Sequence, residues 1–454
     1  MPPTPRIRTV EGSCWGCKQR RVICDLAVPT CGKCAKIGRR CDYGTVRLRW
    51  TDCVASRGRL AGKKIPLYQP PALQRSQDQH LLYFENELLP RLNLSNTVPR
   101  IDLSFLSRDP ILSQSVIAVA NAHQTYAYQS SDENSAVARI QDRNNALRVF
   151  RKHLMAAHND EVNHSLFIAN VLLCILDGML GPTTENSAAA AHHHLVGGKA
   201  ILKHWEGGQD IFDQTEELPI LMLSIFTTMD LTHSLLIGDE PYLDQPSWAR
   251  FGNCEAWWGN VKSDDDFLQT MGILANLATL GHGVRHFSNT VPIDTLLAIQ
   301  TSLDEQANQL TVDDETHGSV ERSAWAAFCS VYRFTASVYL YRALSGLDVD
   351  HHLVQQAVSS CMEVISSPAL PSQLQHCILF PLLVVGTLCM EENQRVTIRR
   401  SIERTSAYLS FESLRSLTLF LEGRWKMLDQ ENEAYRKSDW WSYFEDIALA
   451  TCLF

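Results

Sequence analysis

The chain has 454 residues, of which 45% are hydrophobic and 20% charged, a composition that is typical of a globular protein and excludes disorder throughout. The net charge of −9 is unevenly distributed, because residues 1–64 hold 15 Lys and Arg against 4 Asp and Glu, whereas the other 390 residues hold 26 against 46. A basic head on an acidic body is typical of a polyanion-binding module joined to a larger domain.

No targeting or membrane segment is expected. The first ten residues contain no apolar run that could act as a secretory signal. The apolar stretches near 164–176 and 377–390 are broken by Asn170, or by Pro381 and Gly386, before they reach the ~18 apolar residues of a membrane span. We therefore expect an intracellular protein without membrane contact, in a compartment that keeps thiols reduced.

Six of the 14 cysteines lie close together and repeat the unit C-x2-C-x6-C: Cys14, Cys17, Cys24, Cys31, Cys34 and Cys41. Two C-x2-C pairs in a reducing compartment indicate a metal site rather than disulfides. One tetrahedral zinc ion would use only four of the six thiolates, and two separate ions would need eight. Six sulfurs satisfy two zinc ions if two thiolates each bridge both ions. Such a closed site has no position for water, so the zinc is predicted to be structural.

The other eight cysteines are scattered singly, mostly among apolar neighbours: Cys53, Cys174, Cys254, Cys329, Cys361, Cys377, Cys389 and Cys452. Free cysteine behaves as a small apolar side chain and is often buried. We expect buried thiols at these positions, without a role in metal binding.

Residues 14–43 resemble the fungal binuclear zinc-cluster family. The similarity includes the basic run after Cys17, the Pro29-Thr30-Cys31 turn and the closing Cys41-Asp42-Tyr43. The resemblance implies a small domain, assigned to residues 1–45, of two short helices and loops around two structural Zn²⁺ ions. It also implies that Cys14 and Cys31 are the bridging ligands. The chain departs from the family at Ile23, where a Lys or Arg is common, which removes one phosphate contact and leaves the metal site intact.

The segment K-Q-R-R-V-I between Cys17 and Cys24 is long enough for about two helical turns. The resemblance places this helix in the major groove of double-stranded DNA, where Arg or Lys can bind guanine O6 and N7 in a CGG-type triplet. Arg20 and Arg21 correspond best to the base-reading end, and Lys18 lies nearer the backbone. For each of them, a solvated cation or a phosphate contact is the alternative. The second half of the repeat is expected to grip phosphates through Lys33, Lys36, Arg39 and Arg40.

Residues 46–76 are predicted to form a basic linker, because Pro and Gly interrupt any helical pattern there. Arg47 and Arg49 are expected to follow the DNA backbone, and the basic run is also consistent with nuclear import or with a solvated linker. The apolar residues keep no 3.5-residue period, so a coiled coil is not predicted. Any homodimer would then form through the helical domain.

Residues 77–454 are predicted to form one large all-α domain, because strand alternation and sustained repeats are absent. Asp109-Pro110 has the form of a helix start, with a capping carboxylate before a first-turn proline. The acidic and irregular segment 239–266 suggests a division into two lobes. Amphipathic stretches predict helices at 136–157, 164–180, 186–205, 217–237, 293–310, 321–345, 352–366 and 412–428.

This domain resembles the fungal-specific transcription factor domain of the second type. The similarity rests on L-L-Y-F-E-N-E-L-L-P (81–90) and on H-L-V-G-G-K-A (194–200), although Ala191 stands where that family often has Trp. The adjacent His192-His193-His194 is not a predicted metal site, because consecutive helical residues point ~100° apart. The aromatic and acidic segment 438–449 is interpreted as a docked terminal helix that buries Trp440, Trp441 and Phe444, with an activating segment as the alternative.

The leading hypothesis is therefore a nuclear, sequence-specific regulator that binds DNA through the cluster and acts with the transcription machinery at RNA polymerase II promoters. The rival hypothesis is a zinc-bearing adaptor whose cluster binds protein and whose helical domain is the working part. The strong positive charge of the cluster favours the regulator. An enzyme is not predicted, because the sequence has no G-x-S-x-G, P-loop or dinucleotide-binding fingerprint.

Overall fold

A computed structural model describes residues 12–39, 41, 43, 79–94, 103–128, 133–156, 164–178, 189–204, 217–309, 319–411, 413–430, 439–451 and 453. The chain divides into two compact units, Met1–Ala72 and Leu73–Phe454, and each is described by itself. The predicted linker at 46–76, with Arg47 and Arg49, lies outside the described residues, as does Arg40.

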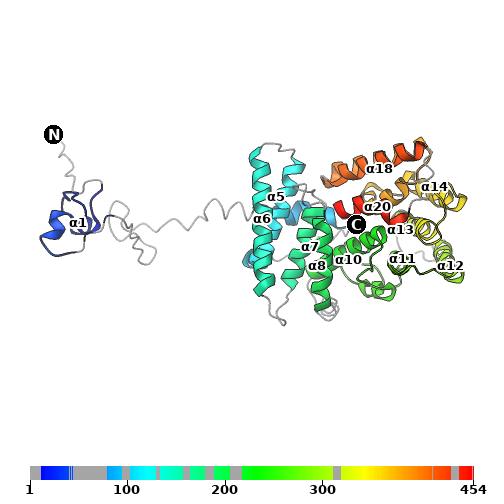
Figure 1. The fold of residues 1–454 in the computed structure, drawn as a ribbon, viewed down its shortest axis with the longest axis horizontal. Helices are drawn as coiled ribbons and strands as arrows, with labels where there is room; N and C mark the ends of the chain where they lie inside the picture. The colour runs from blue at the N-terminus through cyan, green and yellow to red at the C-terminus, as the bar shows by residue number, and fades with distance from the viewer. Residues whose placement is uncertain are drawn as a thin grey trace. The chain divides into compact units, whose positions relative to one another are not determined.

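The first unit contains two short helices, α1 (Trp15–Arg20), which Figure 1 labels, and α2 (Gly32–Ala35), and they are joined by a loop. The helix predicted over residues 18–23 is therefore displaced toward the N-terminus. Helix α1 begins after Cys14, whose side chain caps it, and it ends at Arg21, which adopts a left-handed conformation with φ of 57°. This early end turns the chain back, so that Cys24 joins the other cysteines.

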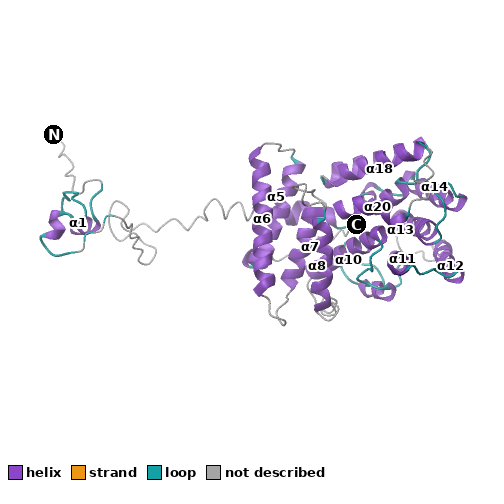
Figure 2. Cartoon of the chain, in the orientation of Figure 1, coloured by secondary structure: helices purple, strands orange, loops and turns teal. Residues whose placement is uncertain are grey.

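The second unit is built from helices, and no strand occurs within the ranges described above (Figure 2). The eight helices predicted from amphipathic patterns are all confirmed, with ends that differ by about four residues or fewer when η6 is counted as the continuation of α13. Its elements in chain order are η1 (Phe84–Leu88), η2 (Leu89–Leu92), α4 (Leu103–Arg108), α5 (Pro110–Ala127), α6 (Glu133–Ala156), α7 (His164–Gly178), α8 (Ala190–His204), α10 (Glu217–Ile237), η5 (Gln245–Phe251), α11 (Asp266–Phe287), α12 (Ile293–Gln309), α13 (Ser319–Tyr339), η6 (Leu340–Leu344), α14 (His352–Ser366), α15 (Ser372–Gln375), α16 (Leu379–Gly386), α17 (Glu392–Leu409), α18 (Ser413–Asp429) and α20 (Trp440–Ala450).

Local capping explains where several helices begin. The Asp109 carboxylate accepts hydrogen bonds from the backbone N–H groups of Ile111 at 2.8 Å and Leu112 at 3.2 Å, as the sequence predicts. Asp265 caps α11 in the same way, since it accepts from Phe267 N at 2.8 Å. Such side chains satisfy backbone donors that have no partner within the helix.

Helices α5, α6, α7 and α8 pack side by side, and α10 connects them to the rest of the unit (Figure 1). Helix α10 is the one helix, among those described, that is long and apolar enough to cross a membrane. All 18 residues of its most apolar window are buried inside the domain. Its composition is that of a central core helix, because neighbouring helices cover it on every side.

The predicted division into two lobes near 239–266 is wrong. This segment contributes Trp248, Phe251, Trp257 and Trp258 to the one hydrophobic cluster of the helical unit, each at most 3% exposed. The indole N–H of Trp257 donates to Thr228 Oγ1 on α10 at 3.0 Å. Irregular backbone can bury aromatic side chains and expose charged ones without a fixed period. The acidic residues that suggested a boundary can therefore belong to a segment that packs in the core.

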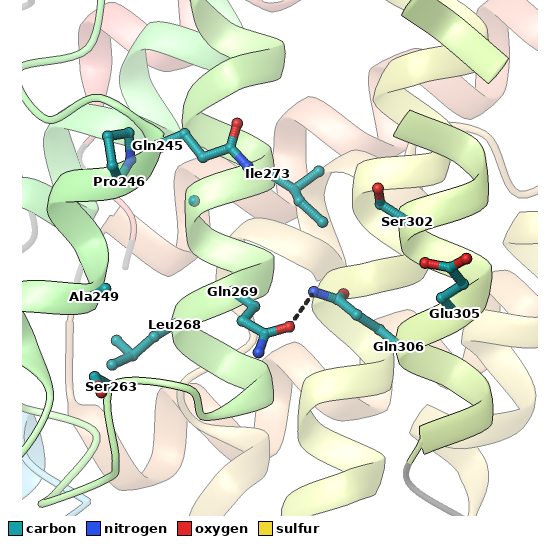
Figure 3. Close-up of a pocket in the computed structure, with 11 residues that line it drawn as sticks. Gln245, Pro246, Ala249, Ser263, Leu268, Gln269, Ile273, Ser302, Glu305 and Gln306 are labelled. Atoms are coloured by element: carbon teal, nitrogen blue, oxygen red, sulfur yellow. Dashed lines mark hydrogen bonds between the residues drawn. The ribbon is translucent and has the colours of Figure 1, made fainter. Parts of the chain in front are cut away.

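A cavity of about 480 Å³ lies between η5, α11 and α12. Figure 3 shows Gln269 and Gln306 pointing toward one another across it, and Gln306 Nε2 donates to Gln269 Oε1 at 3.2 Å. Its described lining residues include one carboxylate, that of Glu305, and no histidine, cysteine or lysine. The amide pair therefore joins α11 to α12 where apolar packing is incomplete.

Gly198 allows α8 to approach α7 and α10 closely, and we expect Gly198→Ala to destabilise the helical domain. An added Cβ would lie 2.3 Å from Phe226 Cε2 and 2.8 Å from Asn170 Nδ2. Overpacking of this kind costs ~1–3 kcal/mol, more than the up to ~1 kcal/mol gained from helix propensity. Gly197→Ala is the matched control, because its Cβ would make an ordinary 3.5 Å contact with Asn170 Oδ1. Urea unfolding followed by helical circular dichroism tests this, and equal stability of the two variants would contradict it.

Candidate metal centre and nucleic-acid interface

The two halves of the cysteine repeat fold in the same way. Cys14 and Cys31 each stand at the N-cap of a short helix, with φ and ψ of −63° and 155° in the first and −68° and 146° in the second. The Cys14 sulfur accepts a hydrogen bond from Cys17 N at 3.4 Å, and the Cys31 sulfur accepts one from Cys34 N at 3.3 Å. The repeated sequence therefore produces a repeated turn that directs both sulfurs of each C-x2-C pair inward.

All six cysteines converge. Their sulfurs form two groups of four whose members lie within 4.8 Å of one another, Cys14-Cys31-Cys34-Cys41 and Cys14-Cys17-Cys24-Cys31. The Sγ–Sγ distance is 3.6 Å between Cys14 and Cys31 and 3.5 Å between Cys17 and Cys31. Four thiolates around a tetrahedral zinc, at Zn–S bonds of about 2.3 Å, stand roughly 3.8 Å apart. The residues therefore fit two zinc ions, and the two groups share Cys14 and Cys31.

The environment of the sulfurs affects their ionisation unequally. Burial raises the pKa of the Cys17 thiol to about 12. Burial acts in the same direction on Cys31, but hydrogen bonds from Cys34 N and from the neighbouring thiols outweigh it and lower the pKa of Cys31 to about 6. Cys31 therefore ionises more readily than Cys17 before metal binding. A bound zinc ion deprotonates the thiols that coordinate it, and so supplies the charge that burial alone would not allow.

Two polar side chains join the halves of the repeat. Asp25 accepts hydrogen bonds from Gly32 N, at 2.9 Å to Oδ2 and 3.1 Å to Oδ1. A Cβ at Gly32 would lie 2.6 Å from Asp25 Oδ2, so a side chain at this position would displace the carboxylate. Tyr43 donates to Ala27 O at 3.0 Å, and its hydroxyl lies 3.6 Å from Cys24 Sγ.

The predicted DNA-binding cations separate into two kinds. The Arg20 guanidinium turns inward, where Nη2 lies 3.5 Å from Cys34 Sγ and 3.7 Å from Cys17 Sγ and donates to Lys33 O at 3.2 Å. Nε donates to Gly16 O at 3.2 Å, so the described contacts of Arg20 are made within the cluster unit, whereas it was predicted to contact bases. The others that the structure describes are exposed, namely Lys18, Arg21, Lys33, Lys36 and Arg39.

The prediction of buried thiols at the remaining cysteines is largely confirmed. Five of the eight scattered cysteines are buried, Cys254 is half-buried, and Cys53 and Cys452 lie outside the described residues. The three consecutive histidines have three different surroundings. His193 is exposed, His194 Nε2 lies 3.3 Å from Asp177 Oδ2, and the His192 ring stacks on His233 of α10. The sequence pattern did not reveal this contact, because residues 192 and 233 belong to different helices.

Comparison with known families assigns both units. The fungal Zn(2)-Cys(6) binuclear cluster domain matches residues 12–51, and the fungal specific transcription factor domain matches residues 80–454. A search of curated proteins found no significant match. The first family binds two zinc ions and DNA, in agreement with the convergence of six cysteines. The second family covers most of the helical unit, and its members are typically not enzymes. The chain therefore belongs to the fungal transcription regulators that combine a binuclear zinc cluster with a fungal specific transcription factor domain.

Proposed function

We propose that this regulator acts in the nucleus at RNA polymerase II promoters and recognises a CGG-type triplet through the exposed end of α1. In this proposal the six cysteines are the zinc ligands, with Cys14 and Cys31 bridging the two ions. The two four-sulfur groups that share these two residues support the assignment.

The observation that carries the proposal is the different environment of Arg20 and Arg21. Arg20 is directed at the sulfurs, whereas Arg21, the C-cap of α1, is exposed together with Lys18 on the same short helix. We assign Arg20 to neutralising the cluster, whose two zinc ions and six thiolates sum to −2. Arg21 is assigned to guanine recognition and Lys18 to the adjoining backbone. Lys33, Lys36 and Arg39 are assigned to phosphates, as are Arg40, Arg47 and Arg49 outside the described residues.

Arg21→Ala is expected to weaken binding to a CGG-containing duplex by ~1–3 kcal/mol and to weaken binding to a scrambled duplex much less. The reason is that only the first duplex offers the O6 and N7 pair of the guanine. Fluorescence anisotropy of the full-length protein with both duplexes, at several salt concentrations, provides the measurement.

Lys36→Ala is the matched control, because it removes an exposed cation from the second half of the repeat. It should weaken both duplexes about equally and reduce the slope of log affinity against log salt by about one unit. Equal losses on both duplexes with Arg21→Ala would make Arg21 a phosphate contact. A wild-type protein that prefers no duplex would favour the adaptor, in which the cluster binds protein.

Homodimerisation through the helical domain stays a prediction, which sedimentation of the full-length protein can test.

A further inference from the structure

Three side chains from separate parts of the helical domain meet at one point: His192 on α8, His233 on α10 and Asp239 in the loop after α10. One ligand atom from each lies within 4.8 Å of the others. We propose that these three residues bind one divalent ion of the zinc class, separate from the cysteine cluster. The proposal does not depend on the DNA-binding role of the cluster.

His233 is buried and His192 is half-buried, and each has one buried ring nitrogen without a hydrogen-bond partner in the described part of the chain. His233 is 5% exposed, and within the described part of the chain neither His233 Nε2 nor His192 Nδ1 has a hydrogen-bond partner. Buried polar atoms in folded proteins are nearly always paired, and unpaired ones call for an explanation such as an ion. The two rings stack with centroids 5.1 Å apart, so the imidazoles are direct neighbours although they come from different helices.

The third ligand is held by a tight turn. Gly238 ends α10 with a φ of 71°, and its N–H donates to Ser234 O at 2.8 Å. A Cβ at Gly238 would lie 2.6 Å from Arg285 Cδ, so the turn requires glycine. His282 Nδ1 lies 3.1 Å from Gly238 O and so supports the same turn from α11. Asp239 therefore leaves α10 in a fixed direction toward the two histidines.

His286 forms the outer support of Asp239. Its Nε2 lies 3.8 Å from Asp239 Oδ1, and both side chains are about 40% exposed, at 41% and 38%. Ligand carboxylates are usually oriented by such outer partners, whose loss weakens metal binding. The exposure also leaves a path from solvent to the ion and a coordination position for water. The site would therefore be open and exchangeable, unlike the closed thiolate cluster.

The donor set selects the class of ion. Two imidazoles and one carboxylate suit zinc and neighbouring transition metals, whereas calcium and magnesium prefer oxygen ligands throughout. Ligand nitrogens of a tetrahedral zinc, at Zn–N bonds of 2.0–2.1 Å, stand roughly 3.3 Å apart, so small side-chain rotations would close the site. The nearby Lys199 ammonium already has an anionic partner, because it lies 2.8 Å from Asp230 Oδ1 and donates to Glu240 O at 2.6 Å. Asp230 therefore offsets the repulsion between Lys199 and a bound cation.

A second group, Asp239 with His282 and His286, also lies within 4.8 Å. We favour the first group because His282 already has a partner in Gly238 O and because the second group is more exposed. A bound ion in the first group would link α8, α10 and the following loop, and so would make the packing of the regulatory domain respond to available metal.

Cobalt titration of the full-length protein with zinc already in its cysteine cluster can test the site. We expect one Co²⁺ per chain in addition to the cluster zinc, counted by mass spectrometry of the metals. Its visible absorption should lack the thiolate charge-transfer bands of a cysteine site. Asp239→Asn should reduce the affinity for this ion at least ~100-fold, because loss of an outer partner alone costs ~10–100-fold. His286→Ala should reduce it ~10-fold.

His233→Phe should also abolish binding while keeping an aromatic ring stacked on His192. His376→Phe is the matched control, because His376 is likewise buried and stacked, on Tyr408 at 4.0 Å, but belongs to neither ligand group. The Asp239 variant keeps the test valid if His233→Phe does not fold. The proposal is overturned if no additional ion binds, or if binding survives both Asp239→Asn and His233→Phe. It is also overturned if the His282→Ala, His286→Ala double variant abolishes binding while His233→Phe retains it.

Discussion

Cys31→Ser is expected to release both cluster zinc ions and to unfold the region around the cysteines, with loss of DNA binding. The hydrophobic cluster of this unit, as far as the structure describes it, consists of five buried cysteines with Val22 and Cys41 packed against them. No aliphatic or aromatic core seen in these residues could replace the metal. Structural zinc contributes an apparent ~10–16 kcal/mol per site to folding, so its loss exceeds what so small a unit can compensate.

Cys31 is the sharpest position for this test because its sulfur belongs to both four-sulfur groups. Zinc should be counted in the Asp239→Asn background, so that the site proposed in the helical domain does not contribute. Two ions per chain are expected with Cys31 intact and none after Cys31→Ser. Cys254→Ser removes a half-buried thiol of the helical domain and should retain both ions. Retention of one zinc ion by Cys31→Ser would contradict the shared-ligand arrangement, and chelator-resistant structure would contradict the dependence on metal.

Deletion of residues 439–454 is expected to unfold the helical domain. The predicted docked helix is confirmed as α20, in which Trp440, Trp441 and Phe444 are at most 4% exposed. Trp440 Nε1 donates to Leu235 O on α10 at 2.9 Å, and Thr232 Oγ1 donates to Leu453 O at 2.7 Å. Truncation of one buried Phe or Trp to Ala costs ~3–5 kcal/mol, and whole domains are stable by only ~5–15 kcal/mol. Loss of three such side chains is therefore enough to unfold the domain.

The control for this deletion keeps the helix and removes its charge. Glu445 and Asp446 are exposed on the outer face of α20, so Glu445→Gln with Asp446→Asn should leave the thermal unfolding temperature almost unchanged. Circular dichroism of both variants measures folding, and a reporter gene measures transcriptional output. A truncated protein that stays folded and loses only output would restore the activating-segment interpretation.

The metal centre and most helices could be read from the sequence because both depend on local spacing. Ligands of a small cluster must lie close together along the chain, so six cysteines at regular intervals suffice to predict two zinc ions. Amphipathic periods and capping residues such as Asp109 are equally local, which explains why helix ends were predicted closely. The docking of α20 followed from its aromatic side chains, which are too apolar to remain in water.

Only the tertiary structure decided how side chains from different elements meet. The inward turn of Arg20 depends on sulfurs from both halves of the repeat, so helical spacing alone could not separate it from Arg21. The acidic residues of segment 239–266 suggested a domain boundary, but they show only which side of the segment is exposed. On its buried side, Trp257 contacts Ser224 on α10 and Phe267 on α11. His192, His233 and Asp239 carry no common motif at all. Their meeting results from the packing of α8 against α10, which long-range burial of apolar surface determines and no local pattern records.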